Sequence, residues 1–329
     1  MINLAVIGTN FITDRLLEGV ALCPGIQATA VYSRTMERAR EYAAAHSLPL
    51  TFNSLDQLAA CQDIDAVYIA SPTCCHAAQG VQMLQAGKHV LCEKPIASNQ
   101  RELNQMLQAA DEQGVVLLEA IRAVFTPAYR WLQERLERIG PVRRVSLSFC
   151  QYSSRYDKFK NGVIENAFRP ELSNGAIMDI GVYPLHLMVS LFGPPQSVTA
   201  QGVVLPGSID GEGTVLARYP GMLAQVAYSK ISDSTLPNEI QGEGGCLLFG
   251  PGGVPRWAKA VYRGGASEQA PADSCPQDMY YEVRQFVHLI HACSGASVPE
   301  GRQYRQASLH TMQVLDEARR QIGIRFPAD

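Results

Sequence analysis

The residues best suited to chemistry follow a short apolar run. The run His89-Val-Leu-Cys92 ends directly in Glu93, Lys94 and Pro95. In an open parallel sheet, ligands bind beyond the carboxyl ends of the strands. A lysine at such an end is placed to touch a cofactor and a substrate together. Because only an X–Pro bond makes the cis form energetically accessible, the Lys94–Pro95 peptide is a candidate for a cis bond.

A second set of polar residues lies in an apolar segment of the second half of the chain. If this segment is helical, Asp179, Tyr183 and His186 share one face at positions i, i+4 and i+7. Polar side chains on an apolar helix need partners or a cavity, so they are predicted to line a substrate site. Pro184 is expected to bend the helix. The structural alternatives are a Tyr183 hydroxyl in a buried network and a hydrogen-bonded core histidine at 186.

The elements that position these residues can be predicted from the sequence. In the first half of the chain, apolar runs alternate with helical patterns. The runs that predict strands are Leu4–Ile7, Ile26–Tyr32, Ile64–Ala70, His89–Cys92 and Val115–Leu118. Such alternation indicates an α/β fold with a doubly wound parallel sheet of the Rossmann type. We assign residues 1–121 to this predicted dinucleotide-binding domain.

The turn after the first strand carries a degraded dinucleotide fingerprint. Of the pattern G-x-G-x-x-G only Gly8 is present, and Asn10 and Thr13 occupy the other two positions. Asparagine tolerates positive φ, so the turn can still form. Backbone N–H groups at the following helix start can hold a pyrophosphate. The residues predicted to contact the cofactor here are Gly8, Thr9, Asn10, Phe11 and Ile12.

The end of the second strand predicts which nicotinamide cofactor binds. NAD-selective folds place an acidic residue about 20 residues after the glycines, on the ribose hydroxyls. This chain instead has Ser33 and Arg34, with Arg38 one turn later. A guanidinium suits a 2′-phosphate, so NADP is predicted, with NAD as the alternative. The remaining predicted cofactor contacts follow the third and fourth strands: Ala70, Ser71, Pro72, His76, Glu93 and Lys94.

Residues 122–329 are predicted to form one second domain. Alternating runs such as Thr214–Tyr219 and Leu223–Ser229 indicate antiparallel strands, and Ala307–Ile322 indicates a final helix. The polar stretch Ser153–Ser173 is longer than most loops without a function, so it is predicted to form a wall of the substrate site. Arg169 in this loop is a predicted substrate contact.

Together these motifs carry a family resemblance. The strand followed by Gly8-x-Asn10, the segment Ala70-Ser71-Pro72 with His76, and Glu93-Lys94-Pro95 resemble the glucose–fructose oxidoreductase / inositol dehydrogenase (Gfo/Idh/MocA) family. The resemblance implies a Rossmann domain followed by an α+β domain with a large, mostly antiparallel sheet. It also implies NAD(P)-linked oxidation or reduction of sugars, polyols, diols or related carbonyl compounds, and a homodimer or homotetramer paired through the second sheet.

Within the family, a tyrosine at position 183 resembles the glucose–fructose oxidoreductase and dihydrodiol dehydrogenase branch. Tyr183 is then the expected acid–base group. A free tyrosine titrates near pH 10, and an ammonium such as that of Lys94 favours the tyrosinate. Asp179 is expected to orient Lys94 or a substrate hydroxyl. The alternative function is a catalytically inactive NAD(P)-binding regulator that acts through protein contacts, which the degraded glycine turn would fit.

Composition narrows the class of protein. Over 329 residues the chain is 47% apolar and has a net charge of −3 with no basic run, which argues against a nucleic-acid partner. No apolar stretch approaches the roughly 20 residues expected of a membrane span. The nine cysteines show no metal-binding spacing, so we expect no metal and free thiols in a reducing cytoplasm. The predicted partner is a small-molecule substrate.

Overall fold

The computed structural model describes residues 1–293 and 299–329, and the chain divides into two compact units. The first comprises Met1–Ala120 and Cys275–Ser308, and the second comprises Ile121–Ser274 and Leu309–Asp329. The predicted division at residues 121 and 122 therefore differs from these units in one respect. Residues 275–308, predicted within the second domain, group with the first unit because helix α9 (Met279–Ala292) packs on helix α1 (Phe11–Leu22).

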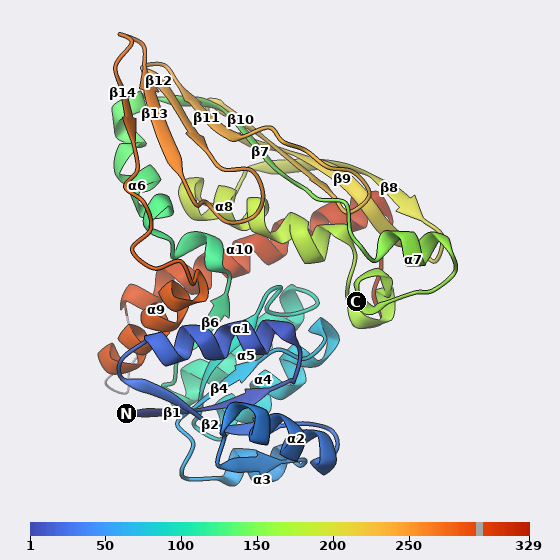
Figure 1. Cartoon of the computed structure of the whole chain (residues 1–329). Helices are drawn as coiled ribbons and strands as arrows, with labels where there is room; N and C mark the ends of the chain where they lie inside the picture. Colours follow the sequence, from blue (N-terminus) through green and yellow to red (C-terminus); the bar gives the residue numbers. More distant parts are fainter. Residues whose placement is uncertain (294–298) are drawn as a thin grey trace. The chain divides into compact units, whose positions relative to one another are not determined.

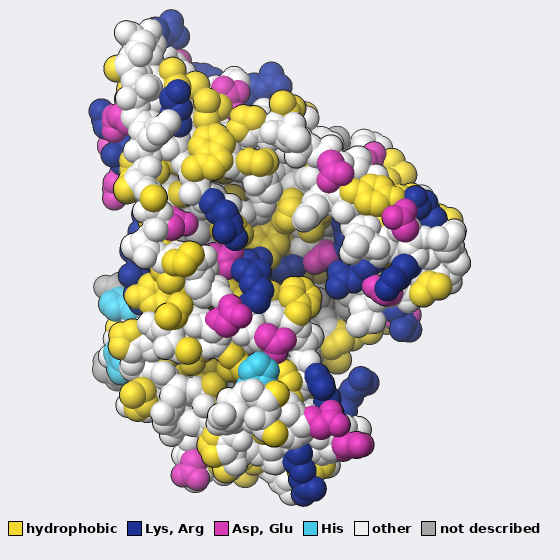
Figure 2. All heavy atoms as spheres, in the orientation of Figure 1, with side chains coloured by type: hydrophobic (Ala, Val, Ile, Leu, Met, Phe, Trp, Pro, Cys, Tyr) yellow, Lys and Arg dark blue, Asp and Glu magenta, His cyan; other side chains and the backbone are white. Residues whose placement is uncertain are grey.

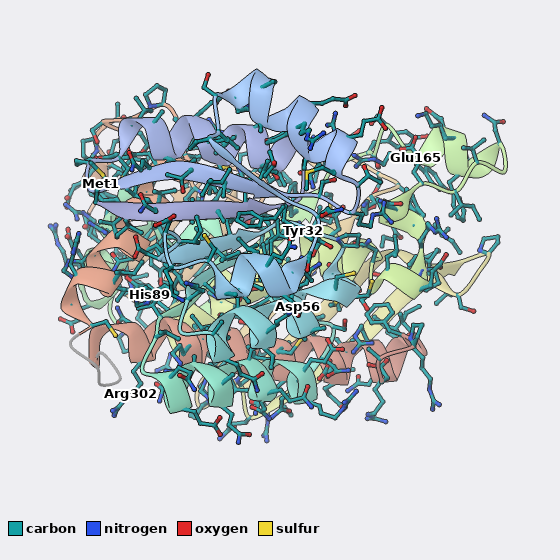
Figure 3. All side chains as sticks on the ribbon, turned by 90° about the horizontal axis from the view of Figure 1, so that it is seen from below. Met1, Tyr32, Asp56, His89, Glu165 and Arg302 are labelled. Carbon is teal, nitrogen blue, oxygen red and sulfur yellow. The ribbon has the colours of Figure 1, made fainter. Side chains whose placement is uncertain are left out.

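The first unit is built on a six-stranded parallel sheet with the order β3-β2-β1-β4-β5-β6, which confirms the predicted Rossmann arrangement (Figure 1). Its strands are β1 (Ile2–Ile7), β2 (Ile26–Tyr32), β3 (Leu50–Phe52), β4 (Ala66–Ile69), β5 (His89–Glu93) and β6 (Leu117–Ala120). Met1 lies at the amino ends and Tyr32 at the carboxyl ends of the first two strands (Figure 3). The carboxyl ends carry the predicted cofactor residues.

Besides α1, the helical segments between β1 and β6 are α2 (Met36–His46), α3 (Leu55–Ala60), η1 (Thr73–Cys75), α4 (His76–Gln85) and α5 (Gln100–Gln113). Four helices of the first unit, α1, α2, α3 and α5, begin at polar caps. Asn10, Thr35, Ser54 and Asn99 each accept a hydrogen bond from a backbone N–H of the first turn, as N-cap residues do. Helices α4 and α5 pack against each other.

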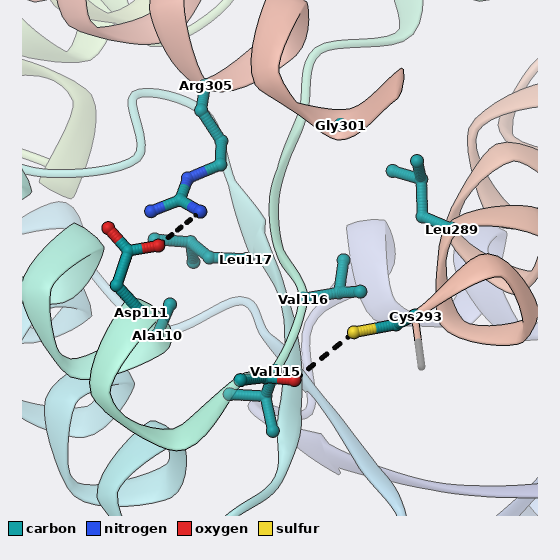
Figure 4. Close-up of a pocket in the computed structure, with 10 residues that line it drawn as sticks. Ala110, Asp111, Val115, Val116, Leu117, Leu289, Cys293, Gly301 and Arg305 are labelled. Carbon is teal, nitrogen blue, oxygen red and sulfur yellow. Dashed lines mark hydrogen bonds and ion pairs between the residues drawn. The ribbon is translucent and has the colours of Figure 1, made fainter. Parts of the chain in front are cut away.

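The C-terminal part of the first unit adds a small cavity of about 30 Å³ beside β6 (Figure 4). Arg305 of helix α10 (Pro299–Ile322) pairs with Asp111 of α5 at 2.7 Å. The Cys293 thiol lies 3.1 Å from the Gly114 carbonyl oxygen. These contacts attach the segment after residue 275 to the Rossmann sheet. Helix α10 contributes residues up to Ser308 to this unit and residues from Leu309 to the second.

The second unit holds an eight-stranded sheet with the order β14-β13-β12-β11-β7-β10-β9-β8. Only β7 and β10 pair in parallel, so the predicted mostly antiparallel sheet is confirmed. The strands are β7 (Val142–Cys150), β8 (Ser197–Leu205), β9 (Ile209–Tyr219), β10 (Met222–Ser229), β11 (Asn238–Gly242), β12 (Gly245–Phe249), β13 (Ala258–Tyr262) and β14 (Ser267–Gln269). The sequence pattern did not predict β3, β13 or β14.

Helical segments pack on one face of this sheet (Figure 1). They are η2 (Arg122–Val124), α6 (Pro127–Arg135), η3 (Glu137–Ile139), the π-helical turn η6 (Ile177–Gly181) and α8 (Val182–Phe192). The loop after β7 contains α7 (Tyr156–Lys160), η4 (Asn166–Phe168) and η5 (Pro170–Leu172). By length and composition Pro170–Phe192 could span a membrane, contrary to our expectation, but 78% of its most apolar window is buried inside the fold, as in a core helix.

The packing of α1 on α9 depends on a glycine. A Cβ at Gly19 would lie 3.1 Å from the backbone nitrogen of Tyr280 and 3.2 Å from the carbonyl carbon of Met279. Gly19→Leu keeps good helix propensity but overpacks this contact, so we expect about 1–3 kcal/mol of destabilisation. Denaturant unfolding measures it. Gly264→Leu, where a Cβ meets nothing within 4 Å, is the matched control, and equal stability of the two variants would contradict the prediction.

Candidate active site

The turn after β1 brings the first strand close to the fourth. Gly8 has φ of +115°, and a Cβ there would lie 2.8 Å from the Ala70 carbonyl oxygen. Both the conformation and the close approach require glycine. The Asn10 amide donates to the same carbonyl oxygen at 2.8 Å. The two predicted residues Gly8 and Asn10 therefore fix the ends of β1 and β4 to each other.

Asn10 also changes how this turn can meet an anion. Its Oδ1 accepts hydrogen bonds from the backbone N–H groups of Ile12 at 3.0 Å and Thr13 at 3.3 Å. We expected N–H groups at this helix start to hold a pyrophosphate, but these two serve the asparagine cap. Phe11, at the first helical position, is 63% exposed. In the described geometry the Ile12 and Thr13 N–H groups therefore already have an acceptor within the turn.

The two predicted arginines after β2 have different surroundings. Arg38 of α2 donates from Nε to Thr9 Oγ1 at 3.1 Å and from Nη2 to the Thr9 carbonyl at 3.0 Å. It thereby ties the turn after β1 to α2. Arg34 is exposed at the end of β2, next to the half-buried Ser33. The structure thus places one guanidinium in the turn itself and presents the other to solvent.

His76 bridges two predicted cofactor segments from inside the fold. Its Nε2 lies 2.8 Å from the Ser71 carbonyl oxygen, and its Nδ1 lies 2.9 Å from the Pro95 carbonyl oxygen. The ring is buried, and burial lowers the pKa of His76. A neutral imidazole donates one hydrogen bond, so His76 donates to one of the two carbonyls. Its side chain fastens the turn after β4 to the turn after β5, while Ser71 Oγ donates to Gln79 at 2.6 Å.

The turn that carries Lys94 is held by two buried carboxylates. Glu93 accepts a hydrogen bond from the Tyr68 hydroxyl at 2.6 Å, and Glu119 accepts from the Ile96 backbone N–H at 3.1 Å. Ser308 of α10 donates to the second oxygen of Glu119 at 2.6 Å. The Lys94–Pro95 peptide between them is cis. Lys94, half-buried, is therefore mounted on a turn whose two flanks are fixed.

In the second unit, the π-turn and α8 carry the other predicted residues. Tyr183 is 5% exposed, and its hydroxyl oxygen accepts a hydrogen bond from Arg122 Nη2 at 3.1 Å. Pro184 has no N–H to continue an α-helical ladder, which fits the wider turn just before it. His186 is in the core, where its Nδ1 lies 3.0 Å from Ser190 Oγ and burial lowers its pKa to about 3. The geometry at His186 matches the core alternative.

Asp179 has a partner that the sequence did not point to. Lys230, directly after β10 and buried, pairs with the Asp179 carboxylate and lies 5.1 Å from the centroid of the Phe168 ring. Asp210 lies near the same ammonium, and burial raises the pKa of Asp210 to about 6. Asp179 is predicted to orient Lys94 or a substrate hydroxyl, and its carboxylate is already paired with Lys230 of the same unit.

The long loop after β7 folds on its own aromatic cluster. Phe168 and Ala167 pack on Ile209, with Tyr156 and Phe159 beside them. Charged side chains of both signs intermingle over the α7 segment (Figure 2). The pairs are Lys158 and Arg155 with Glu165, Lys160 with Asp157, and Arg169 with Glu171. Arg169, the predicted substrate contact, is exposed and 2.7 Å from Glu171, so a substrate would compete with this carboxylate.

Comparison with known proteins places this arrangement in a family. Residues 2–120 match the model of the oxidoreductase family with an NAD-binding Rossmann fold, GFO/IDH/MocA, and residues 129–248 match the GFO/IDH/MocA C-terminal domain. The chain belongs to the GFO/IDH/MocA family. The predicted resemblance is confirmed.

Curated relatives of this family member span its whole length. It is 47% identical over 329 residues to scyllo-inositol 2-dehydrogenase (NADP(+)) IolU of Bacillus subtilis, covering 100% of this chain and 99% of the relative. It is 30% identical to trans-1,2-dihydrobenzene-1,2-diol dehydrogenase of Xenopus laevis, covering 97% of each. Among solved structures, the 3-ketoreductase KijD10 of Actinomadura kijaniata superposes with a TM-score of 0.85 at 23% identity, covering 99% of each chain, which supports the fold.

Three residues of this GFO/IDH/MocA chain escaped the sequence argument although they share one property. Glu119 is the last residue but one of β6, Arg122 lies two residues after the end of β6, and Lys230 directly follows β10. Each is a charged residue within two residues of the carboxyl end of a strand, as Lys94 is after β5. Glu119 and Lys230 are buried in the fold, and Arg122 is half-buried. Treating every charged residue at a strand end as a candidate would have found all three.

The buried Glu119 makes stability depend on pH. Burial raises the pKa of Glu119 from 4.5 to about 7, so the folded chain keeps this proton over a range in which the unfolded chain loses it. Folding stability should therefore fall by about 2–3 kcal/mol between pH 5 and pH 8 from this group. Glu119→Gln should remove most of that slope. Denaturant unfolding at both pH values tests this, with the exposed Glu112→Gln as control; an unchanged slope in Glu119→Gln would contradict it.

Proposed function

We propose that this chain is an NADP-dependent dehydrogenase that oxidises a secondary alcohol on a six-membered carbon ring, with scyllo-inositol as the first substrate to test. The observation that carries the proposal is 47% identity, over the full length of both chains, to a scyllo-inositol 2-dehydrogenase (NADP(+)). The alternatives are other sugars, polyols, diols or related carbonyl compounds.

The two kinds of curated relative share a chemical feature. Scyllo-inositol and trans-1,2-dihydrobenzene-1,2-diol, after which these relatives are named, both carry neighbouring hydroxyl groups on a six-membered carbocycle. In the oxidation, one hydroxyl group loses its proton and the carbon that bears it loses a hydride, while the neighbouring hydroxyl group stays intact and can be hydrogen-bonded. A site for cyclic diols and polyols of this kind needs one acid–base group for the reacting oxygen and separate polar groups that bind the neighbouring hydroxyl. Tyr183 and Asp179 are our assignments for these two roles.

Tyr183 is the proposed acid–base residue and Lys94 its assistant. The nicotinamide, when bound, accepts the hydride from the carbinol carbon. Tyr183 accepts the hydroxyl proton, so that the substrate O–H bond breaks as the phenol O–H bond forms. The Lys94 ammonium hydrogen-bonds the substrate oxygen and stabilises negative charge there. The turn that carries Lys94 is fixed by the hydrogen bonds of Glu93 and Glu119 on either side of it, and a catalytic ammonium needs such a fixed position.

The proposed cofactor is NADP, with NAD as the alternative. Gly8, with φ of +115°, provides the tight turn between β1 and α1 that the first glycine of a dinucleotide fingerprint provides. Arg34 is exposed at the end of β2, where no acidic side chain is present to favour an unmodified ribose. Arg38 stands over the same turn at Thr9. These two guanidinium groups are our assignment for the 2′-phosphate.

We further propose a cytoplasmic homodimer or homotetramer. All nine cysteines are free thiols, as expected in a reducing compartment. One face of the second sheet presents apolar side chains to solvent, among them Leu216 on β9 and Leu223 on β10, which are 45% and 50% exposed. Exposed apolar patches commonly mark protein interfaces. This open face is the surface we assign to subunit pairing.

The direct test is turnover. Purified protein with NADP⁺ and scyllo-inositol should form reduced nicotinamide, followed by its absorbance, and activity should be higher than with an acyclic polyol. Lys94→Ala and Tyr183→Phe should each lower kcat by about 100-fold or more while NADPH binding is retained. Tight NADPH binding without turnover of any ring alcohol or diol would instead favour the non-catalytic regulator.

The cofactor assignment has its own test. Arg34→Ala should weaken NADPH binding by about 10- to 100-fold, because a charge-assisted hydrogen bond to the 2′-phosphate is lost, and should leave NADH binding unchanged. Fluorescence titration of both cofactors measures this. Arg40→Ala, which removes an exposed arginine from the following helix α2, is the control. Equal weakening of NADPH and NADH in Arg34→Ala would overturn the 2′-phosphate assignment.

A further inference from the structure

The Tyr183 ring is held on several sides within the second unit. Its centroid lies 5.7 Å from that of Phe149 in an edge-to-face contact. A Cβ at Gly253 would lie 2.7 Å from Tyr183 Cγ and 2.8 Å from Phe149 Cε1, so only a glycine fits there. With the ring 5% exposed, its hydroxyl oxygen has little freedom to move. The groups around that oxygen therefore decide what it can do.

A guanidinium lies beside this oxygen. Arg122 Nη2 donates to the Tyr183 hydroxyl oxygen at 3.1 Å, and Arg122 Cζ is 5.8 Å from the ring centroid. An arginine side chain is always charged and can only donate hydrogen bonds. The contact therefore stabilises a phenolate oxygen more strongly than a phenol oxygen. It also occupies one lone pair, which directs the other acceptor position elsewhere.

We propose that Arg122 is a further catalytic residue, which keeps the Tyr183 oxygen ready to accept the substrate proton. The proposal rests on the proposed function, in which Tyr183 is the acid–base group. In the oxidation, the substrate O–H bond breaks and the proton moves to Tyr183 Oη. Arg122 gives up no proton and receives none. The Arg122 guanidinium balances negative charge on the Tyr183 oxygen before the proton is transferred, and its hydrogen bond to that oxygen remains after the transfer.

The placement of Arg122 in the chain supports this role. Arg122 and Tyr183 belong to the same compact unit, since η2 and α8 both lie within Ile121–Ser274. Lys94 belongs to the other unit. The Tyr183 oxygen thus has a cation that is carried by its own unit. Lys94 is then left to act on the substrate oxygen.

The experiment compares Arg122→Gln with two matched variants. Arg130→Gln removes an exposed arginine from the neighbouring helix α6, and Tyr183→Phe removes the oxygen on which Arg122 acts. With NADP⁺ and scyllo-inositol, Arg122→Gln should lower kcat by about 100-fold, the cost of losing one preorganised donor, with KM and NADPH binding little changed. Arg130→Gln should match the parent chain. Added guanidinium should restore part of the turnover of Arg122→Ala.

The double variant isolates the contact. If Arg122 acts through the Tyr183 oxygen, Arg122→Gln should cause no further loss in a Tyr183→Phe background. An additional loss of about 100-fold there, or normal turnover of Arg122→Gln alone, would overturn the proposal. Failure of the parent chain to turn over any ring alcohol would count instead against the proposed function.

A measurement that needs no substrate tests the contact even if the parent chain turns over no ring alcohol, and it also shows whether the variant is folded. In protein labelled with ¹³C at tyrosine Cζ, the Tyr183 resonance is identified by its loss in Tyr183→Phe. Arg122→Gln should shift this resonance, since the hydrogen bond at the attached oxygen is lost, and Arg130→Gln should not. An unmoved resonance in a folded Arg122→Gln protein would contradict the contact on which the proposal stands.

Discussion

Two buried carboxylates hold the turn that carries Lys94, and much of the first unit is arranged around them. Glu93 receives the Tyr68 hydroxyl of β4, and Glu119 of β6 receives the Ile96 N–H. Three neighbouring strands are thereby tied at their carboxyl ends. Burying a carboxylate is unfavourable unless its oxygens accept hydrogen bonds, so each partner matters. The cost is visible in Glu119, whose pKa burial raises to about 7.

The frame of the protein could be predicted from the sequence because its strong patterns are local. Ile26–Tyr32 was predicted to the residue, since this mostly apolar run of seven residues is followed directly by the polar Ser33 and Arg34. Strands β3 and β14, of three residues each and without a fully buried residue, carry no such run. The membership of residues 275–308 in the first unit could not be predicted either. It depends on contacts such as Arg15 with Asp278, 263 positions apart.

The candidate site was only partly predictable, for a related reason. Residue types at strand ends, such as Lys94, are visible in the sequence, but their partners are not. Asn10 was expected to replace a glycine in a turn, and it also caps α1 and bonds to Ala70. Loop cations that suggested an acidic substrate are paired with carboxylates of the same loop, as Arg169 is with Glu171. Sequence spacing says nothing of such competition.

The return of the chain to the first unit has a consequence for synthesis on the ribosome. Domains generally fold as units, the N-terminal one first, as they emerge. Here Met1–Ala120 lacks α9 and the start of α10, and Glu119 lacks the Ser308 hydroxyl, until the chain has been made as far as residue 308. Until then the α9-facing side of α1 stays uncovered in the nascent unit, and Glu119 lacks the hydrogen bond from Ser308. For this protein, the first unit is completed only after Ile121–Ser274 of the second unit have been synthesised.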